Sequence, residues 1–217
     1  MPKISICETD VLILCGGLGT RFREVENNIP KALAPINGTP FIDLLLNDLV
    51  DQGFRRIILA TGHLSSKLEQ YVKGRKDAEY IISFESEPMG TGGAIKLAER
   101  HIRSDIFLIL NGDTHIQLGY SHMINFHLQM ESDFTICLSN INDKSGFGSI
   151  CINDKKKIIS FNEKTIIQNS LANAGVYCAN KKILKNIEKD KYLSVEKFLI
   201  PNWIKKYNLF GYETSLE

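Results

Sequence analysis

Apolar residues in the first half of the chain gather into short runs, each followed by a longer stretch in which apolar residues recur at helical spacing. The short runs predict buried β-strands, and the longer stretches predict amphipathic helices. Strands are predicted at residues 11–15, 56–61, 80–84 and 106–110, and helices at residues 40–53, 65–72 and 91–102. This alternation is typical of a parallel sheet that helices cover on both faces.

The second half of the chain is richer in predicted strands. A helix at residues 120–130 precedes strand-like runs at 134–138, 148–152, 158–161, 171–178 and 207–212, with a turn at 153–155 and helical segments at 181–188 and 194–206. The pattern as a whole predicts an α/β fold, a Rossmann-like three-layer α/β/α sandwich with a mostly parallel mixed central sheet.

A glycine-rich stretch follows the first predicted strand. Residues 14–21 read L-C-G-G-L-G-T-R. Glycine permits positive φ, and successive N–H groups in such a turn can point at one anion. Thr20 adds a hydroxyl, Arg21 adds a planar cation suited to phosphate, and Lys31 adds a second cation after the rigid Pro30. The stretch predicts a phosphate-binding loop, and the alternative is an ordinary glycine-rich turn with two surface cations.

Acidic residues follow two other predicted strands. Residues 85–88, E-S-E-P, follow one strand, and Asp113 follows another in L-I-L-N-G-D-T. Ligands of parallel sheets bind where the carboxyl ends of strands meet, so we expect these residues and the Gly16 loop to share one edge. Asp113 is a candidate Mg²⁺ ligand, because Mg²⁺ takes one or two carboxylates plus substrate phosphates. The alternative is a turn that caps the next segment, and His115 more often packs than binds metal.

Composition and charge narrow the function classes. The chain has 217 residues, 43% of them hydrophobic, and a net charge of +1, so no strong field attracts nucleic acid or acidic membranes. No apolar run approaches the roughly 20 residues that span a bilayer. Residues 1–9 lack the apolar core of a signal peptide, so we expect a cytoplasmic protein. Five cysteines without a C-x-x-C pair predict neither disulfides nor a zinc site, and Cys15 has no nearby His to activate it as a nucleophile.

The motif G-G-x-G-T-R followed by P-K-A-L-A-P-I resembles the signature of the sugar-1-phosphate nucleotidyltransferases (NDP-sugar pyrophosphorylases). The resemblance covers nearly the whole chain. It implies the nucleotide-diphospho-sugar transferase type of fold in one domain, residues 1–217, with a nucleotide-binding half (about 1–115) and a sugar-phosphate-binding half (about 116–217). It implies Arg21, Lys31 and Asp113 as catalytic residues and Asp113 as the Mg²⁺ ligand. The implied partners are a nucleoside triphosphate and a sugar 1-phosphate, and the sequence carries no signal for an oligomeric state.

The segment E-P-M-G-T-G-G-A at residues 87–94 resembles the family segment that borders the nucleobase. Small residues let a flat base lie against the backbone, and Thr91 could cap the following helix. A plain glycine-rich helix entry is the alternative. The residues implied in nucleotide binding are Cys15, Gly16, Gly17, Gly19, Thr20, Glu87, Gly90, Thr91 and Gly92.

Three shorter motifs in the second half resemble the family's sugar-phosphate site. They are F-G-S at residues 147–149, F-N-E-K at 161–164 and N-A-G-V-Y at 173–177. The resemblance implies that the Gly148 amide contacts the sugar, that Glu163 and Asn173 bind sugar hydroxyls, and that Lys164 binds the sugar phosphate. Each motif alone is equally typical of a turn or an ion pair, and it is their order after the nucleotide half that favours a site.

The motifs are most similar to the branch of D-glycero-α-D-manno-heptose-1-phosphate guanylyltransferases, which implies GTP as the favoured nucleotide. Enzymes that act on mannose, N-acetylmuramate or glucose 1-phosphate share most of these residues and are alternatives. The chain departs from the family at its end, because it lacks the later acidic metal ligand of a D-I-G-x-P segment. This predicts either a C-terminus truncated relative to the family or a metal held differently, with Glu213 and Glu217 as weak candidates.

Two other hypotheses for the function are considered. A catalytically inactive relative that binds a nucleotide or nucleotide sugar is consistent with the missing late carboxylate. A nicotinamide dehydrogenase is weaker, because Phe22 stands where G-x-G-x-x-G requires glycine. The Walker pattern of P-loop proteins is also absent from the sequence.

Overall fold

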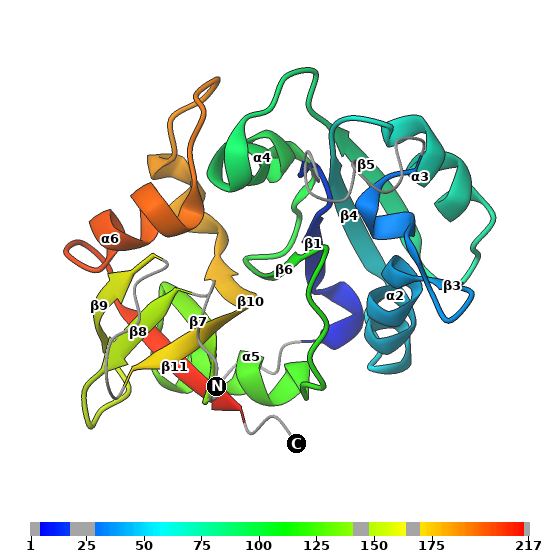
Figure 1. The fold of residues 1–217 in the computed structure, drawn as a ribbon. Coiled ribbons are helices and arrows are strands. Elements are labelled where there is room, and N and C mark those ends of the chain that lie inside the picture. Colours follow the sequence, from blue (N-terminus) through cyan, green and yellow to red (C-terminus); the bar gives the residue numbers. More distant parts are fainter. Residues whose placement is uncertain (1–4, 18–28, 141–147, 164–169, 215–217) are drawn as a thin grey trace.

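A nine-stranded mixed sheet forms the centre of the protein (Figure 1). The computed structural model describes residues 5–17, 29–140, 148–163 and 170–214. The main path of the sheet runs β11-β7-β10-β6-β1-β4-β5, and β8 and β9 extend it from β10. The strands are β1 (Asp10–Leu14), β4 (Arg56–Thr61), β5 (Glu79–Phe84), β6 (Ile106–Asn111), β7 (Phe134–Ser139), β8 (Ser149–Ile152), β9 (Ile158–Asn162), β10 (Leu171–Asn180) and β11 (Leu209–Thr214).

Strand direction divides this sheet into two parts. β1, β4, β5 and β6 run parallel, as the alternation of strands and helices predicted. β10 is antiparallel to both of its neighbours, β6 and β7, and β11 is parallel to β7. β10 therefore joins the strands of the two halves of the chain within one continuous sheet.

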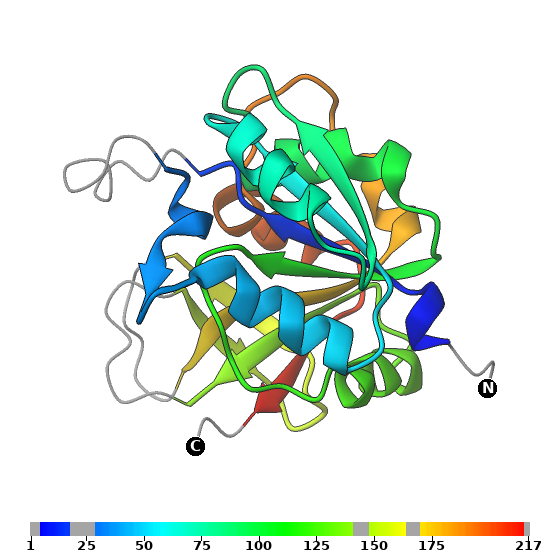
Figure 2. The ribbon, with the colours of Figure 1, turned by 90° about the vertical axis from the view of Figure 1, so that its right-hand side faces the viewer.

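Helices cover both faces of the sheet (Figure 2). One face packs against α2 (Phe41–Asp51), α3 (Ser65–Lys73) and α5 (Tyr120–Gln129), and the other against α4 (Gly90–Ala98), the 3-10 turn η4 (Lys181–Asn186), the π-helical turn η5 (Val195–Leu199) and α6 (Ile200–Trp203). Short 3-10 turns η1 (Ile6–Glu8), η2 (Lys31–Leu33) and η3 (Glu99–His101) and a small hairpin of β2 (Pro35–Ile36) and β3 (Thr39–Pro40) complete the described elements. The predicted three-layer α/β/α architecture is confirmed.

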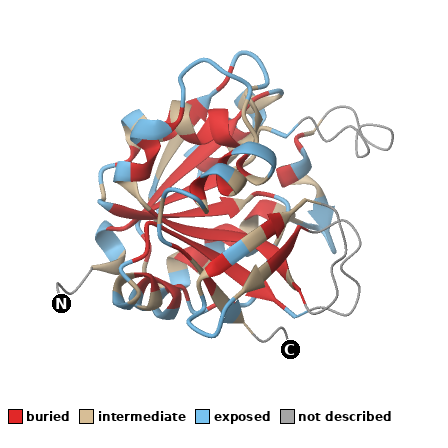
Figure 3. Ribbon diagram, turned by 90° about the vertical axis from the view of Figure 1, so that its left-hand side faces the viewer, coloured by how far each residue is buried: buried red, intermediate tan, exposed pale blue. Residues whose placement is uncertain are grey.

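The core lies on both sides of the central strands, which are buried while the outer helix faces are exposed (Figure 3). In β1, Val11 and Ile13 belong to the cluster packed under α2, whereas Leu12 belongs to the cluster under α4. Successive side chains of a strand point to opposite faces, so a strand covered on both faces must be apolar throughout. This explains why the first predicted strand is a continuous apolar run.

The helical segment predicted at residues 194–206 differs from expectation. It forms the π-helical turn η5 followed by the single turn of α6, with Pro201 in the first turn of α6. Proline has no backbone N–H, so it cannot donate to the carbonyl one turn earlier, and a continuous α-helix cannot pass through it undisturbed. Residues 181–188, also predicted as helical, form the 3-10 turn η4, which ends at Asn186.

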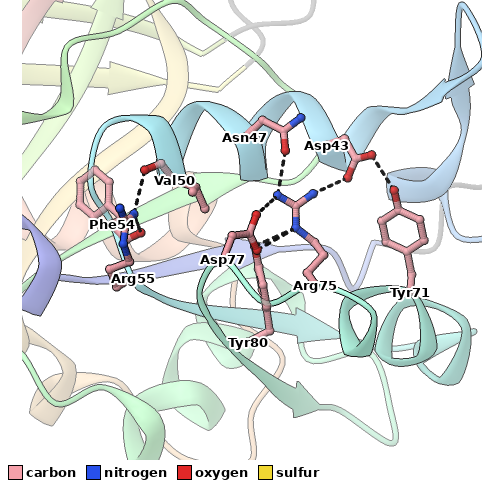
Figure 4. Close-up of polar contacts among 9 residues, drawn as sticks. All are labelled: Asp43, Asn47, Val50, Phe54, Arg55, Tyr71, Arg75, Asp77 and Tyr80. Carbon is pink, nitrogen blue, oxygen red and sulfur yellow. Dashed lines mark hydrogen bonds and ion pairs between the residues drawn. The ribbon is translucent and has the colours of Figure 1, made fainter.

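A polar cluster fixes α2 to the segment between α3 and β5 (Figure 4). The guanidinium of Arg75 donates to Asp43 Oδ1 at 3.0 Å and to Asn47 Oδ1 at 2.7 Å on α2, and to the Tyr80 hydroxyl at 2.9 Å on β5. The side chains of Arg75 and Asp43 are 17% and 15% exposed, so their ion pair is largely shielded from solvent. The cluster holds in place the helix that follows the Lys31 turn.

The described residues contain no helix that combines the length and the apolar character needed to cross a bilayer.

Candidate active site

The carboxyl ends of the parallel strands β1, β4, β5 and β6 meet at one edge of the sheet. In register, Leu14 at the end of β1 pairs with Ala60 of β4 and with Asn111 of β6. The glycine turn after β1, the acidic segment after β5 and Asp113 after β6 therefore emerge on the same side. This confirms the prediction that these segments, far apart in sequence, share one edge.

Asp113 is paired with Lys31 at this edge. The chain leaves β6 through Gly112, whose N–H donates to the carbonyl of Leu14 at 3.0 Å, so the turn lies against β1. Lys31 begins η2, and its Nζ lies 2.7 Å from Oδ2 of Asp113. Both side chains are 48% exposed, so a dissolved ligand can reach them. Two of the three predicted catalytic residues are thus in contact across 82 positions of sequence.

A pocket of about 590 Å³ opens at the same edge of the sheet, where β1, β4 and β5 end. The backbone of Gly16 forms one wall, and the exposed ring of Phe84 forms part of another. The lining consists of Gly16, Gly62, His63, Leu64, Ser65, Ser66, Phe84, Glu85, Ser86, Glu87 and Pro88. Two predicted nucleotide-binding residues, Gly16 and Glu87, are among them. A pocket with an aromatic wall, glycine backbone and carboxylates suits a flat, polar ligand.

Glu85 is a pocket residue that the motif-based assignment missed in favour of Glu87. Glu87 is exposed, whereas Glu85 is 8% exposed and accepts a hydrogen bond from the Met89 N–H at 3.2 Å. A Cβ atom at Gly16 would lie only 2.5 Å from Glu85 Oε1, so glycine at position 16 leaves the space that this carboxylate occupies.

Burial raises the pKa of Glu85, and the Met89 N–H opposes that rise. The signal in the sequence was the position of Glu85, which is the first residue after a predicted strand. A buried carboxylate in the lining of a pocket can accept hydrogen bonds from the N–H groups of a ligand.

Gly90, Thr91 and Gly92 contact the segment that precedes η5, which lies beside α4 in Figure 1 (orange and green). Gly90 has φ +70°, and a Cβ atom there would lie 2.5 Å from the carbonyl oxygen of Leu193. The Gly92 N–H donates to that same oxygen at 2.8 Å. The small residues thus permit a close approach of this protein segment. The expectation that Thr91 caps α4 is wrong, because α4 begins at Gly90 and the Thr91 hydroxyl bonds the Val195 N–H and Glu196 instead.

The sugar-half residues Gly148 and Asn173 are directly connected. The Asn173 N–H donates to the Gly148 carbonyl at 2.9 Å, and a Cβ atom at Gly148 would lie 2.6 Å from the Phe161 ring. Asn173 is 8% exposed; its Oδ1 accepts from the Gly175 N–H at 3.0 Å and its Nδ2 donates to the Tyr177 hydroxyl at 2.8 Å.

The pairing of β10 with β7 shifts between Asn173 and Tyr177. Within this irregular stretch, Gly175 has φ +71°, and a Cβ atom there would lie 2.7 Å from Asn111 Nδ2 at the end of β6. The irregularity therefore brings the N-A-G-V-Y motif against the N-G-D turn that carries Asp113. Burial raises the pKa of Tyr177 well above its usual value, and the negative charges of Glu196 and, to a smaller extent, Glu163 raise it further.

Cys15 follows the last residue of β1, and its side chain lies close to Gly112. A Cβ atom added to Gly112 would be 3.0 Å from Cys15 Sγ. Burial, followed by the charge of Asp113, raises the pKa of the Cys15 thiol to about 12. A neutral thiol is a poor nucleophile, which argues against covalent catalysis by Cys15. Gly17 is exposed, and a Cβ atom there would meet nothing within 4 Å. Gly19, Thr20, Arg21, Lys164 and Glu217 lie outside the described residues.

Within the described parts of the chain, no three His, Cys, Asp or Glu side chains form a group that could hold a metal ion. Glu213, a weak candidate second ligand, pairs with Lys156 at 2.5 Å. It lies on β11, three strand positions from β6, which is about 14 Å across a sheet with a strand spacing of roughly 4.8 Å. In the described structure Glu213 is engaged by Lys156, and its role as a second metal ligand stays a prediction.

The fold and site define an α/β protein that presents a glycine turn, a Lys-Asp pair and a pocket at the carboxyl edge of a Rossmann-like sheet. Residues 10–208 match the family model described as nucleotidyl transferase. The chain is 34% identical to a D-glycero-alpha-D-manno-heptose 1-phosphate guanylyltransferase of Campylobacter jejuni, over 89% of this chain and 86% of the relative. The chain therefore belongs to the nucleotidyl transferase family, as the sequence motifs predicted.

Two further comparisons agree with this. The catalytic subunit beta of a Drosophila melanogaster mannose-1-phosphate guanylyltransferase is 31% identical over 95% of this chain, which spans 58% of that relative. The crystal structure of HddC from Yersinia pseudotuberculosis, complexed with GMP-PN, superimposes with a TM-score of 0.84 at 34% identity, covering 95% of this chain and 90% of HddC.

Proposed function

We propose that the protein transfers GMP from GTP to D-glycero-α-D-manno-heptose 1-phosphate, with release of pyrophosphate, in a Mg²⁺-dependent reaction. The observation that carries this proposal is the contact of Lys31 with Asp113, which lies at the same carboxyl edge of the sheet as the pocket at the end of β1. Nucleotidyl transfer crowds negative charge at one phosphorus, so positioning and electrostatics must supply most of the catalysis.

Glu85 supports guanine as the base. Guanine presents two neighbouring donors, N1–H and the exocyclic N2–H, along one edge, and a carboxylate accepts two parallel hydrogen bonds. Glu85 is a buried residue of the pocket lining held by the Met89 N–H, while Phe84 offers a ring on which a base can stack. The relative HddC was crystallised with GMP-PN, which also supports a guanine nucleotide here.

Lys31, Arg21 and Asp113 support the chemistry at the phosphates. Lys31 places an ammonium at the strand edge, and Arg21 belongs to the glycine loop that follows β1. The half-exposed Asp113 carboxylate fits Mg²⁺, which binds one or two carboxylates and completes its shell with substrate phosphates and water. When bound, the ion would neutralise charge that develops on the triphosphate. Lys31 would then be free to bind a phosphate oxygen.

Asn173, Glu163 and Gly148 support a sugar site next to the phosphates. Gly148 and Asn173 are joined by a backbone hydrogen bond, and the stretch containing Asn173 lies against the turn that carries Asp113. As the family resemblance implies, the acceptor's hydroxyls would bind Asn173 and Glu163, and Lys164, which lies outside the described residues, would bind its phosphate. The attacking oxygen then faces the polyphosphate held at the Lys31-Asp113 pair.

The test is a matrix of ATP, CTP, GTP and UTP against heptose, mannose, glucose and N-acetylmuramate 1-phosphates, read by pyrophosphate release with and without Mg²⁺. Turnover with GTP and the heptose phosphate that requires Mg²⁺ is the expected result. Preference for mannose 1-phosphate would show that the proposed acceptor is wrong. It is the main alternative, because the chain is also similar to the Drosophila relative. Nucleotide binding without turnover for any acceptor would refute the enzymatic proposal.

A further inference from the structure

Glu196 accepts hydrogen bonds from three hydroxyl groups at the junction of the two halves of the chain. Its Oε2 accepts from Thr91 Oγ1 at 3.0 Å and from Ser194 Oγ at 2.8 Å, and its Oε1 accepts from the Tyr177 hydroxyl at 3.3 Å. Thr91 belongs to the first turn of α4, whereas Tyr177 belongs to β10. The carboxylate therefore contacts an element of each half.

Each of these hydroxyls also accepts a hydrogen bond on its other side. Thr91 Oγ1 accepts from the Val195 N–H at 2.8 Å, Ser194 Oγ accepts from the Lys197 N–H at 3.1 Å, and the Tyr177 hydroxyl accepts from Asn173 Nδ2 at 2.8 Å. A hydroxyl has one proton to donate, and an unprotonated carboxylate can only accept. All three hydroxyl protons therefore point toward Glu196.

The direction of these hydrogen bonds also determines the orientation of the Asn173 amide. Because Tyr177 gives its proton to Glu196, it must accept from Asn173, and so the amide nitrogen of Asn173 faces Tyr177. The amide oxygen then faces the Gly175 N–H, which donates to it at 3.0 Å. One N–H and one lone pair of the amide remain for a ligand, in a fixed orientation. An amide turned by 180° would place two donors against each other at Gly175.

We propose that Glu196 is a positioning residue for the acceptor sugar, which acts through Tyr177 and together with the Gly175 N–H to fix which way the Asn173 amide faces. The inference rests on the proposed function, in which Asn173 binds sugar hydroxyls. The anchor on Thr91 makes this orientation depend on α4, so the sugar contact is set relative to the nucleotide half. A change at Glu196 should then affect the acceptor and spare the nucleotide.

The kinetic test uses Glu196→Gln and Tyr177→Phe. A glutamine can donate to Tyr177, which releases the Tyr177 proton toward Asn173, and phenylalanine removes the relay altogether. Each variant should raise the KM for the sugar 1-phosphate about five- to tenfold, the effect of one lost hydrogen bond, while the KM for GTP changes less than about twofold. The double variant should raise the KM for the sugar 1-phosphate little more than either single variant, because both substitutions break the same chain of hydrogen bonds.

The matched control is Tyr207→Phe, which deletes a tyrosine hydroxyl on the same face of the sheet, where the ring packs edge-on to Trp203 with centroids 6.4 Å apart. It should leave both KM values unchanged. A lowered melting temperature in Glu196→Gln or Tyr177→Phe with both KM values unchanged would reduce the network to a structural role and overturn the proposal. Equal rises in both KM values, or additive effects in the double variant, would overturn it as well.

A second readout does not depend on turnover. The side-chain amide signals of Asn173, identified in an NMR spectrum by their loss in Asn173→Asp, should shift or double in Glu196→Gln and Tyr177→Phe and stay in place in Tyr207→Phe. Unchanged Asn173 signals in both relay variants would refute the orienting role. If the wild-type protein released no pyrophosphate with any acceptor, the proposed function would fail, and these signals would still decide whether Glu196 orients Asn173.

Discussion

Lys31 Nζ lies 2.7 Å from Asp113 Oδ2, which joins a cation from the segment after the glycine loop to a carboxylate at the end of β6. Both side chains are 48% exposed, and an exposed ion pair of this kind contributes at most about 1 kcal/mol to stability. The pair is therefore poorly explained as a stabilising contact. Under the proposed function, a magnesium polyphosphate would offer a better partner to each member, a phosphate to Lys31 and a cation to Asp113.

Asp113→Asn should lower kcat about 100-fold or more, since loss of a group that stabilises transition-state charge costs several kcal/mol. The melting temperature should change by little, because the pair is exposed. Pyrophosphate release at saturating Mg²⁺ and thermal unfolding measure the two quantities. Glu213→Gln, which breaks the exposed pair with Lys156, is the control and should affect neither. Near-normal turnover of Asp113→Asn would show that this carboxylate is dispensable.

Glu85→Gln should weaken binding of GTP about 10- to 100-fold, the range for losing hydrogen bonds to a charged group. The amide retains one acceptor and can no longer accept both guanine N–H groups. Glu87→Gln is the matched comparison two positions away, on the exposed rim of the same pocket, and should change GTP binding far less. Calorimetric titration of both variants with GTP shows which of the two carboxylates, Glu85 or Glu87, contributes more to GTP binding. A larger loss in Glu87→Gln would restore the motif-based assignment.

The parallel part of the fold was predictable because its signals are local. Apolar runs and helical periodicity locate β1, β4, β5 and β6 and the helices between them, and right-handed parallel connections leave few ways to arrange them. The insertion of β10 between β6 and β7 was not predictable in the same way. The residues of β10 lie 33 to 45 positions from their partners in β7 and 66 to 74 positions from their partners in β6, and no property of either segment alone specifies these pairings.

The site also has one part that local sequence signals predict and another part that depends on contacts between distant segments. The contact of Lys31 with Asp113 follows from strand order and from the motifs that carry the two residues. The glycines at positions 90 and 92 indicated a close approach to the backbone, yet glycine does not reveal what approaches, and in the structure Leu193 does. Glu85 was passed over because its carboxylate packs against Gly16 and Gly62, two glycines that only the folded sheet brings close to it.

Gly90→Ala should destabilise the protein by about 2 kcal/mol or more, because an alanine at φ +70° is strained and its Cβ atom would lie 2.5 Å from the Leu193 carbonyl oxygen. Gly74→Ala is the control. Gly74 has φ −73°, and its nearest neighbour is 3.5 Å away, so alanine there should be neutral or stabilise by about 0.4–1 kcal/mol. Urea unfolding of the two variants measures the difference. Equal stability of both would mean that the segment at Leu193 moves away without cost.

His127 makes stability depend on pH. The side chain is 1% exposed, and its Nδ1 lies 2.8 Å from Thr135 Oγ1. Burial lowers the pKa of His127 from 6.5 to about 4, against smaller opposing effects of Asn180 and Asp133. Above pH 6.5 the His127 ring is neutral in both the folded and the unfolded protein, so its ionisation does not change the folding stability. Between pH 6.5 and 4 only the unfolded chain takes up the proton, so folding stability falls as the pH falls, and below pH 4 the loss is complete.

The full loss corresponds to about 3 kcal/mol at 1.36 kcal/mol per pKa unit. Other carboxyl groups also titrate in this range, so the quantity to measure is the difference between the wild type and His127→Leu in urea unfolding from pH 7.5 to 4.5. The leucine variant leaves the Thr135 hydroxyl without this partner, a cost that does not vary with pH. The wild-type curve should therefore descend toward the variant curve as the solution becomes more acidic. Parallel curves would mean that the buried imidazole is protonated in the folded protein as readily as in the unfolded chain.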